Sequence, residues 1–241
     1  MNSMIIPAGG SGSRFSNQSS KLLTSFKKST VIEETVNIIV THDLISEVII
    51  ACPESELDQF KLLLNRFSSK LKWAIGGPTR AESVRNAFNI ISKKSQNVLI
   101  HDAVRPNVSK TLIYNIYNNL LKKKAVIPVI KVRDSIKLVK KNYISKNIDR
   151  NGLYLSQTPQ AFCIKELISA YNRIPLAKLK EFTDDAQIYS LLEKKIAIIK
   201  GDEHNYKVTN KKDLIMIENT ITKIANIKVG QGIDVHKFKK G

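Results

Sequence analysis

Two cationic residues stand beside a glycine-rich turn near the start of the chain. The apolar run Met4-Ile5-Ile6 leads into residues 7–14, which read Pro-Ala-Gly-Gly-Ser-Gly-Ser-Arg, and Lys21 follows. Glycine lets a backbone turn through positive φ and approach anionic oxygens closely. Arg14 and Lys21 would add positive charge where phosphates sit. The pattern predicts binding of a phosphate chain, with a tight turn that binds nothing as the alternative.

Two familiar glycine motifs do not fit this loop. A P-loop ends in Gly-Lys followed by Ser or Thr, whereas Gly12 is followed by Ser13 and Arg14. The dinucleotide-binding fingerprint would need a third glycine at position 15, where Phe15 stands. The loop therefore gains its meaning from partners elsewhere in the chain.

The composition favours one main domain. The 241 residues are 42% hydrophobic, which is enough for a sizeable core without disulfides or metals. Cys52 and Cys163 lie far apart and form neither a CxxC pair nor a disulfide framework. No apolar stretch approaches the length of a membrane span, and the N-terminus lacks the pattern of a signal peptide. We expect a cytoplasmic protein that does not bind membranes.

The chain is strongly basic, with a formal net charge of +18. Its lysines are dispersed or stand at turns, as in residues 122–124, without the interleaved aromatic residues of a nucleic-acid surface. We expect a solvated lysine-rich surface and no nucleic-acid partner. Cations gathered around a small anionic substrate remain consistent with this charge, because a positive cleft steers such ligands inward.

Short β-branched runs alternate with longer amphipathic stretches, which predicts an α/β fold with a mostly parallel sheet and helices on both faces. The predicted strands are residues 4–7, 47–51, 71–75, 97–101, 125–130 and 196–200. In such sheets ligands bind beyond the carboxyl ends of the strands. The glycine loop, Gly76-Gly77 and His101-Asp102 each follow a predicted strand, so we expect three loops to converge at one edge.

Helical spacing of apolar residues predicts helices over 84–91 and over 112–121, the second capped by Ser109. Further helices are expected behind residues 183–185 and, capped by Asn210 and Asp213, at the C-terminal end.

Residues 135–156 interrupt this alternation and predict a protruding β-hairpin arm. Because such an arm has little core of its own, it would be stable mainly by pairing with a second subunit.

Six motifs in chain order carry a family resemblance. They are residues 7–14 with Lys21, Gly76-Gly77 with Arg80 and Ser83, 101–106, 149–153, 158–160 and 207–209. Together they resemble the 2-C-methyl-D-erythritol 4-phosphate cytidylyltransferases over nearly the whole chain from residue 4 to about residue 226. The resemblance implies a Rossmann-like nucleotidyltransferase fold, CTP and methylerythritol phosphate as substrates, Mg2+ as cofactor and a homodimer joined by the arm.

The resemblance also implies residue roles. Arg14 and Lys21 would stabilise the transition state on the triphosphate, and Arg150 and Lys207 would position the phosphate of the acceptor for attack. The nucleotide and its metal would be bound by Pro7, Ala8, Gly9, Gly10, Ser11, Gly12, Gly76, Gly77, Arg80, Ser83, Asp102 and Ala103. Asp102 would meet Mg2+. The acceptor would be held by Arg105, Ser135, Thr158 and Thr183. If the arm crosses to a neighbour, Arg150 serves the other subunit's site. His101 is expected to be structural, because attack by an ionised phosphate needs no general base.

The last residues, 227–241, resemble the opening of 2-C-methyl-D-erythritol 2,4-cyclodiphosphate synthase. In that family an Asp-x-His pair binds a divalent metal such as Zn2+, and Asp234 and His236 would lie on one face of a strand. A zinc site needs at least a third protein ligand. We therefore expect a cytidylyltransferase domain at 1–226 and, at 227–241, the first part of a second domain, as in a bifunctional enzyme, without cyclase activity in this chain. A coincidental short match is the alternative.

Two other functions stay open from the sequence. A cytidylyltransferase acting on ribitol 5-phosphate would share the CTP loop and most of the arm, although the synthase-like tail argues against it. A basic nucleic-acid-binding protein would show binding that weakens steeply with salt.

Overall fold

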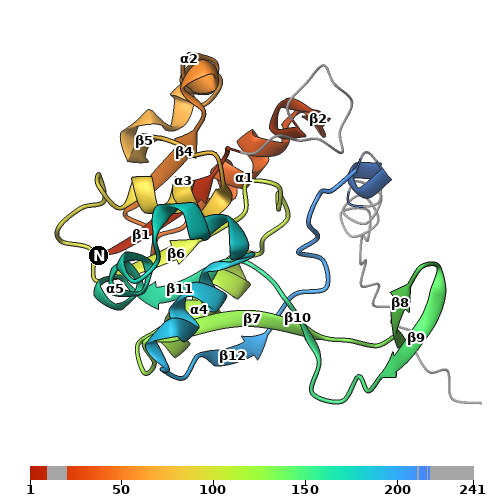
Figure 1. The fold of residues 1–241 in the computed structure, drawn as a ribbon. Helices are drawn as coiled ribbons and strands as arrows, with labels where there is room; N and C mark the ends of the chain where they lie inside the picture. Colours follow the sequence, from red (N-terminus) through yellow and green to blue (C-terminus); the bar gives the residue numbers. More distant parts are fainter. Residues whose placement is uncertain (10–20, 211, 216, 218–241) are drawn as a thin grey trace, which may run out of the picture.

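A central sheet organises the chain, as the computed structural model shows (Figure 1). The structure describes residues 1–9, 21–210, 212–215 and 217. The strands of the sheet are β1 (Asn2–Pro7), β4 (Glu47–Cys52), β5 (Leu71–Ile75), β6 (Asn97–Ile100), β7 (Ala125–Lys131), β10 (Tyr154–Ser156), β11 (Gln160–Cys163) and β12 (Ala197–Lys200). Their order is β10-β7-β11-β6-β1-β4-β5, and β12 also pairs with β7.

Most neighbouring strands of this sheet run parallel. Ile5 at the centre of β1 pairs in register with Ile49 of β4 on one side and Ile100 of β6 on the other. β4 and β5 are parallel, as are β7 and β12. The exceptions are β11, which runs antiparallel between β6 and β7, and β10, which is antiparallel to β7. The predicted mostly parallel sheet and its six predicted strands are confirmed, and β10 and β11 are additions to them.

Helices cover both faces of the sheet (Figure 1). They are α1 (Val31–Val40), α2 (Leu57–Leu63), α3 (Arg80–Ala87), α4 (Lys110–Leu120), α5 (Ile164–Asn172) and α6 (Asp185–Tyr189). Short 3₁₀ turns lie at Lys21–Leu23, Glu54–Glu56, Asn65–Lys70, Leu176–Glu181 and Ser190–Leu192, and a two-strand ladder joins β2 (Ser25–Phe26) to β3 (Ser29–Thr30).

Alternation along the strands divides the core into two layers. Met4 and Ile6 of β1 point into a cluster with α1, α2 and α4, whereas Ile5 points into a cluster with α3, α5 and α6. All three side chains are fully buried. Because strands with both faces covered must be apolar throughout, this arrangement explains the continuous apolar run that opens the sequence.

Side-chain caps fix where three of the helices begin. Ser109 accepts a hydrogen bond from the Leu112 amide at the start of α4, as the sequence predicts. Thr79 does the same at α3, and Thr30 forms a capping box with Glu33 at α1. The cap at Thr79 sets the position of Arg80, the first residue of α3.

The arm is a separate hairpin of β8 (Ile136–Lys140) and β9 (Tyr143–Ile148) that extends from the end of β7 (Figure 1). Lys141 and Asn142 form its turn with positive φ values of 48° and 66°. Its apolar side chains lie in solvent, Tyr143 at 79% and Ile144 at 63% exposure. The predicted protruding hairpin is confirmed over residues 136–148, whereas residues 154–156, predicted as part of the arm, pair with β7 as β10 of the central sheet.

Near the C-terminal end, Asn210 accepts a hydrogen bond from the Asp213 amide and caps a helical segment of which residues 212–215 and 217 are described. Leu214 and Ile217 pack with Phe26 and Val208 in a third, small cluster. Within the described ranges, no helix has the length and apolarity that crossing a membrane requires.

Candidate active site

Loops after β1, β4 and β5 meet at the carboxyl ends of these strands. The Ala8 amide donates to Ala51 O (2.7 Å), and the Gly76 amide donates to Cys52 O (2.7 Å). Ser83 of α3 is fully buried, and its hydroxyl accepts from the Gly77 amide (3.1 Å) and contacts Thr79 O (3.0 Å). The predicted convergence is confirmed for residues 8–9 after β1 and Gly76-Gly77 after β5, with the end of β4 between them as an addition to the prediction, while residues 10–12 of the glycine loop lie outside the described residues.

Glycine is required in the turn after β5. A Cβ on Gly77 would collide with the Cβ of Glu82, and a Cβ on Gly76 would lie 3.1 Å from the Ser83 hydroxyl. A Cβ on Gly9, after β1, would lie 3.3 Å from the same hydroxyl. Gly9 and Gly77 therefore lie beside one another around Ser83.

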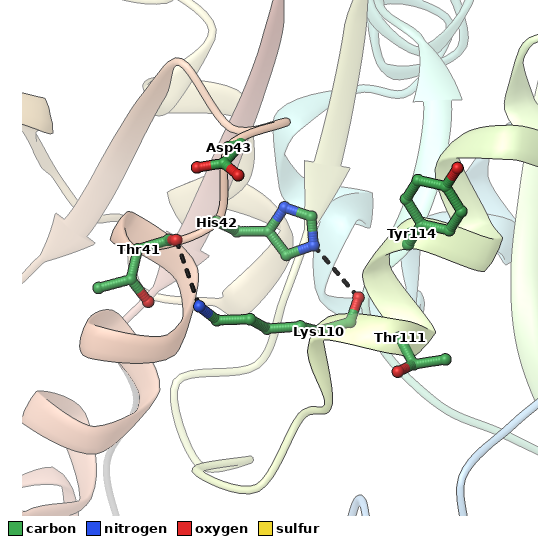
Figure 2. Close-up of a pocket in the computed structure, with 6 residues that line it drawn as sticks. All are labelled: Thr41, His42, Asp43, Lys110, Thr111 and Tyr114. Atoms are coloured by element: carbon green, nitrogen blue, oxygen red, sulfur yellow. Dashed lines mark hydrogen bonds between the residues drawn. The ribbon is translucent and has the colours of Figure 1, made fainter.

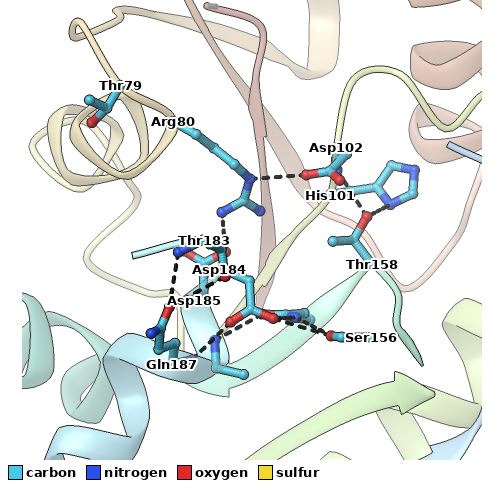
Figure 3. Close-up of polar contacts among 12 residues, drawn as sticks. Thr79, Arg80, His101, Asp102, Ser156, Thr158, Thr183, Asp184, Asp185 and Gln187 are labelled. Atoms are coloured by element: carbon cyan, nitrogen blue, oxygen red, sulfur yellow. Dashed lines mark hydrogen bonds and ion pairs between the residues drawn. The ribbon is translucent and has the colours of Figure 1, made fainter. Parts of the chain in front are cut away.

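Asp102, after β6, is the centre of a cluster of cations. Its Oδ1 lies 3.0 Å from Arg80 Nε, and its Oδ2 lies 2.9 Å from Lys207 Nζ and 3.6 Å from Arg105 Nε. Figure 3 shows the Arg80 guanidinium between Asp102 and a second carboxylate, Asp185, at 2.8 Å from Nη1. Four segments far apart in the sequence thus bring three cations and two carboxylates together.

Charge decides the protonation of this cluster. Burial alone would raise the pKa of Asp102, but the charges of Arg80, Lys207 and Arg105 outweigh it and hold that pKa well below the usual range. Asp102 is therefore a carboxylate at neutral pH. Because the cations outnumber the carboxylates, the cluster retains a positive excess that favours a further anion.

Some donors of the cluster have no hydrogen-bond partner in the described part of the chain. They are Arg80 Nη2 and Arg105 Nε, both buried. Buried donors in proteins are almost always paired. An oxyanion that reached the cluster would supply the missing acceptors.

Thr158 and His101 form a chain of hydrogen bonds that links the Asp102 amide to the Arg105 carbonyl. The Asp102 amide donates to Thr158 Oγ1 (3.0 Å), Thr158 lies 3.0 Å from His101 Nδ1, and His101 Nε2 lies 3.2 Å from Arg105 O. Since a carbonyl only accepts, Nε2 carries the proton, and Thr158 donates to Nδ1 of the neutral ring. Burial lowers the pKa of His101 to about 4, in keeping with that state. The structural role predicted for His101 is to hold this turn.

A C-terminal segment, residues 201–208, braces the cluster from the other side. Asn205 is fully buried, and its side-chain Nδ2 donates to Thr158 O (2.7 Å). The backbone carbonyl of Asn205 accepts from Arg105 Nη1 (2.6 Å). Gln157 donates to Asp202 O (2.8 Å) and accepts from the Asp202 amide (3.0 Å). These contacts fix the segment that carries Lys207.

The remaining predicted site residues divide into three groups. Pro7, Ala8 and Ala103 lie at the strand ends, and Lys21 opens the first 3₁₀ turn. Ser135 and Arg150 are exposed in the arm, where Arg150 donates to Arg133 O, and Thr183 is exposed before α6. Outside the described residues are Gly10, Ser11, Gly12, Arg14, Asp234 and His236.

Sequence reasoning missed three residues of the cluster. Asp185 stands in the first turn of α6, and Tyr171 of α5 donates to it (2.6 Å). Asn205 is the third. A doubled Asp before a helix signals a cap, which Asp184 supplies by accepting from the Gln187 amide. Because Asp184 is enough to cap α6, the adjacent Asp185 was the signal in the sequence for a carboxylate with another role.

A cavity of about 310 Å3 lies between the end of α1 and the start of α4 (Figure 2). The Leu44 amide donates to His42 Nδ1, and His42 Nε2 donates to Lys110 O (3.2 Å). Lys110 Nζ donates to Thr41 O (3.4 Å). This cavity shares no residue with the Asp102 cluster, and these polar side chains are paired within it.

Comparison with known proteins identifies the family and supports the fold. The family model described as 2-C-methyl-D-erythritol 4-phosphate cytidylyltransferase matches residues 3–223. The chain belongs to this family. A cytidylyltransferase of that name from Prochlorococcus marinus subsp. pastoris is 37% identical over 213 residues, covering 88% of this chain and 95% of that protein.

The bifunctional enzyme IspD/IspF of Pelagibacter ubique is 35% identical over 240 residues, or 99% of this chain. This chain spans 61% of the length of that relative. The crystal structure of 4-diphosphocytidyl-2C-methyl-D-erythritol synthase from Anaerococcus prevotii superposes with a TM-score of 0.78 at 28% identity, covering 92% of this chain and 96% of that one. The cytidylyltransferase fold is thus shown for nearly the whole chain.

Proposed function

We propose that this protein transfers the cytidylyl group of CTP to 2-C-methyl-D-erythritol 4-phosphate and releases diphosphate. Membership of the family supports the reaction. The observation that carries the assignment to a site is the gathering of Arg80, Arg105 and Lys207 on Asp102 at the carboxyl ends of the parallel strands.

In this reaction an oxygen of the acceptor's phosphate attacks the α-phosphorus of CTP. A new P–O bond forms there as the bond to the β-phosphate oxygen breaks, and diphosphate leaves with that electron pair. The attacking phosphate is already ionised, so no side chain has to remove a proton. The neutral, hydrogen-bonded His101 agrees with this, because its ring nitrogens are both occupied by protein groups.

The protein's task is to align two polyanions that repel each other and to stabilise the added charge at phosphorus. In the proposed arrangement, Arg14 and Lys21 hold the triphosphate together with the loop amides of residues 8–12. Gly76 and Gly77, which pack closely against Ser83 and Glu82, would offer their backbone groups to the base. Lys207 and Arg150 position the phosphate of the acceptor, and Arg105 helps to hold the acceptor.

Mg2+ is part of this proposal, with Asp102 as its protein ligand. Within the described ranges no three His, Cys, Asp or Glu side chains are grouped to hold a metal alone. A lone carboxylate still suits Mg2+, which in nucleotide sites takes most of its ligands from phosphates and water. When bound, the ion would neutralise phosphate charge.

A homodimer joined by the arm completes the proposal. The arm exposes Tyr143 and Ile144, and a groove of about 570 Å3 at its base is lined by Tyr154 and Ile198, which are 47% and 56% exposed. Apolar surface of this kind favours a protein partner. Arg150 would then reach the partner's site.

Mixing two inactive variants tests this crossing. Lys21→Ala removes a cation of one site, and Arg150→Ala removes one that the neighbour would need. In a mixed dimer one of the two sites has both its own Lys21 and the neighbour's Arg150. Random exchange in an equal mixture makes about half of the dimers mixed, so the mixture is expected to regain about a quarter of wild-type activity. No regain after confirmed exchange would contradict the crossing.

A diphosphate-release assay tests the function itself. Purified protein is supplied with CTP, Mg2+ and, in parallel, methylerythritol 4-phosphate or ribitol 5-phosphate. We expect release with the first acceptor. Release with ribitol 5-phosphate alone would overturn the substrate assignment, and the absence of release with both would overturn the function.

A further inference from the structure

The buried carboxylate of Asp185 reaches the cation cluster from the side opposite Asp102 (Figure 3). It is fully buried, and its two oxygens have separate partners: Arg80 Nη1 at 2.8 Å from Oδ2 and the Tyr171 hydroxyl at 2.6 Å from Oδ1. Its neighbour Asp184 caps α6 and accepts from Gln160 Nε2 (2.9 Å). The start of the helix therefore does not depend on Asp185.

Arg80 links the two carboxylates. Its Nε faces Asp102 Oδ1 and its Nη1 faces Asp185 Oδ2, while Nη2 has no hydrogen-bond partner among the described residues. Burial would lower the pKa of Arg80, but Asp185 and Asp102 more than offset this and raise it. Because a guanidinium is planar and rigid, two fixed nitrogens also fix the direction of the third.

We propose that Asp185, held by Tyr171, is a positioning residue for the cytidylyl transfer. It orients the Arg80 guanidinium, and through Arg80 it orients the Asp102 carboxylate on which Arg105 and Lys207 gather. The inference rests on the proposed function, since it concerns the same site. The ion-pair partners of Asp102 are Arg80, Arg105 and Lys207. Asp185 and Tyr171 would therefore act on Asp102 through Arg80.

The chain of contacts is sterically constrained at each step. Tyr171 is fully buried and packs edge-to-face on Phe88 of the α3 end, with ring centroids 5.1 Å apart. Its hydroxyl therefore has a fixed position for Asp185. A carboxylate with one oxygen on a fixed phenol and the other on a guanidinium has little rotational freedom.

The competing interpretation is purely structural: the Arg80–Asp185 pair would only hold α6 against α3. Both interpretations predict lower stability when the pair is weakened. They differ in turnover, because a group that orients charge toward the transition state changes kcat more than KM. A structural contact changes the fraction of folded protein and leaves kcat per folded molecule unchanged.

Tyr171→Phe and Tyr189→Phe form a matched pair of variants. Tyr189 is also fully buried in the same core cluster, and its hydroxyl donates to another carboxylate, that of Glu166, outside the site. Each variant removes one phenol hydroxyl from a carboxylate. Asp185→Asn is the stronger change, but it leaves a buried guanidinium short of a counter-charge and can prevent folding. Tyr171→Phe is therefore the variant that distinguishes the positioning role from the purely structural one.

The experiment first establishes diphosphate release by the wild-type protein with CTP and methylerythritol 4-phosphate. Absence of that release would overturn the proposed function and this inference with it. With an active wild type, Tyr171→Phe is expected to lower kcat about tenfold with little change in KM, the loss that one hydrogen bond to a charged group can cause. Tyr189→Phe is expected to keep the wild-type kcat.

A double-mutant cycle then tests the route. If Tyr171 acts through Arg80, Tyr171→Phe causes no further loss of kcat in an Arg80→Lys protein. Equal kcat for the two tyrosine variants, or a full independent loss in the Arg80→Lys background, would overturn the positioning role and leave the proposed function standing.

Discussion

The neutral, buried His101 makes the stability of this protein depend on pH in a defined window. Burial lowers the pKa of the ring from its ordinary 6.5 to about 4, and neighbouring Arg105 and Arg80 act in the same direction while Asp102 opposes them. Between these two pH values the unfolded chain binds a proton on His101 that the folded chain does not. The free energy of unfolding therefore falls as the pH falls below 6.5, and the loss is complete only below pH 4.

The size of the effect follows from the two pKa values. Integrating the difference in bound protons between pH 7 and pH 5 gives a loss of about 2 kcal/mol from His101 alone. Measurement above pH 5 keeps this apart from the carboxylates, most of which titrate lower. His101→Asn is expected to be less stable at pH 7, because the contact with Arg105 O is lost, but to lose about 2 kcal/mol less on acidification.

Urea unfolding at pH 7, 6 and 5 measures this difference directly. His204→Gln, which removes an exposed histidine, is the control for the loss of a histidine side chain. Equal slopes for the wild type and His101→Asn would refute the reasoning, because they would mean that His101 takes up its proton equally in both states.

Three further substitutions test other parts of the account. Lys207→Ala is expected to lower kcat/KM about 100-fold, because it removes a cation that stabilises the transition state. Lys200→Ala changes an exposed lysine of β12 and is expected to keep wild-type activity. Equal kcat/KM values for the two variants in the release assay would contradict this. Thr158→Val leaves the Asp102 amide and His101 Nδ1 without their hydrogen-bond partner, and should lower the free energy of unfolding in urea by about 2 kcal/mol. Thr158→Ser keeps the hydroxyl and should restore most of that loss. A Ser variant as unstable as the Val variant would refute the role of the hydroxyl. Glu47→Gln weakens the ion pair between the buried Glu47 and the half-exposed Lys72 (2.7 Å) at the start of β4. It should lower the melting temperature without changing kcat, and a fall in kcat per folded molecule would contradict this.

Much of the fold is readable from the sequence because it follows from local pattern. Six strands and the helix capped by Ser109 come from apolar spacing and a capping residue, and the arm comes from alternation around residues 140–142. The convergence of loops at one edge follows from the geometry of parallel strands. Each inference needed only a short window of residues.

β11 was not predicted because nothing local identifies it. Gln160–Cys163 is a four-residue run that follows Pro159, and its place between β6 and β7 is decided by long-range pairing. The sequence shows a short apolar segment, and only the sheet around it makes that segment a central antiparallel strand.

The sequence pointed to several residues of the cluster around Asp102, but not to the contacts between them. Asp102 and Arg105 are predicted together because they are neighbours in the chain, but Arg80, Asp185 and Lys207 reach Asp102 or one another across long sequence separations. Thr158 is expected at the acceptor by resemblance. In the structure its hydroxyl bonds to His101 and the Asp102 amide, which gives it a positioning role beside the one proposed.

The most direct test of the central claim follows the α-phosphorus of CTP. With CTP labelled at that atom, Mg2+ and methylerythritol 4-phosphate, the account predicts that the label appears in a cytidine diphosphate ester of methylerythritol, with one diphosphate released for each molecule formed. Label recovered as free CMP, or retained in CTP while the acceptor remains unchanged, would contradict it.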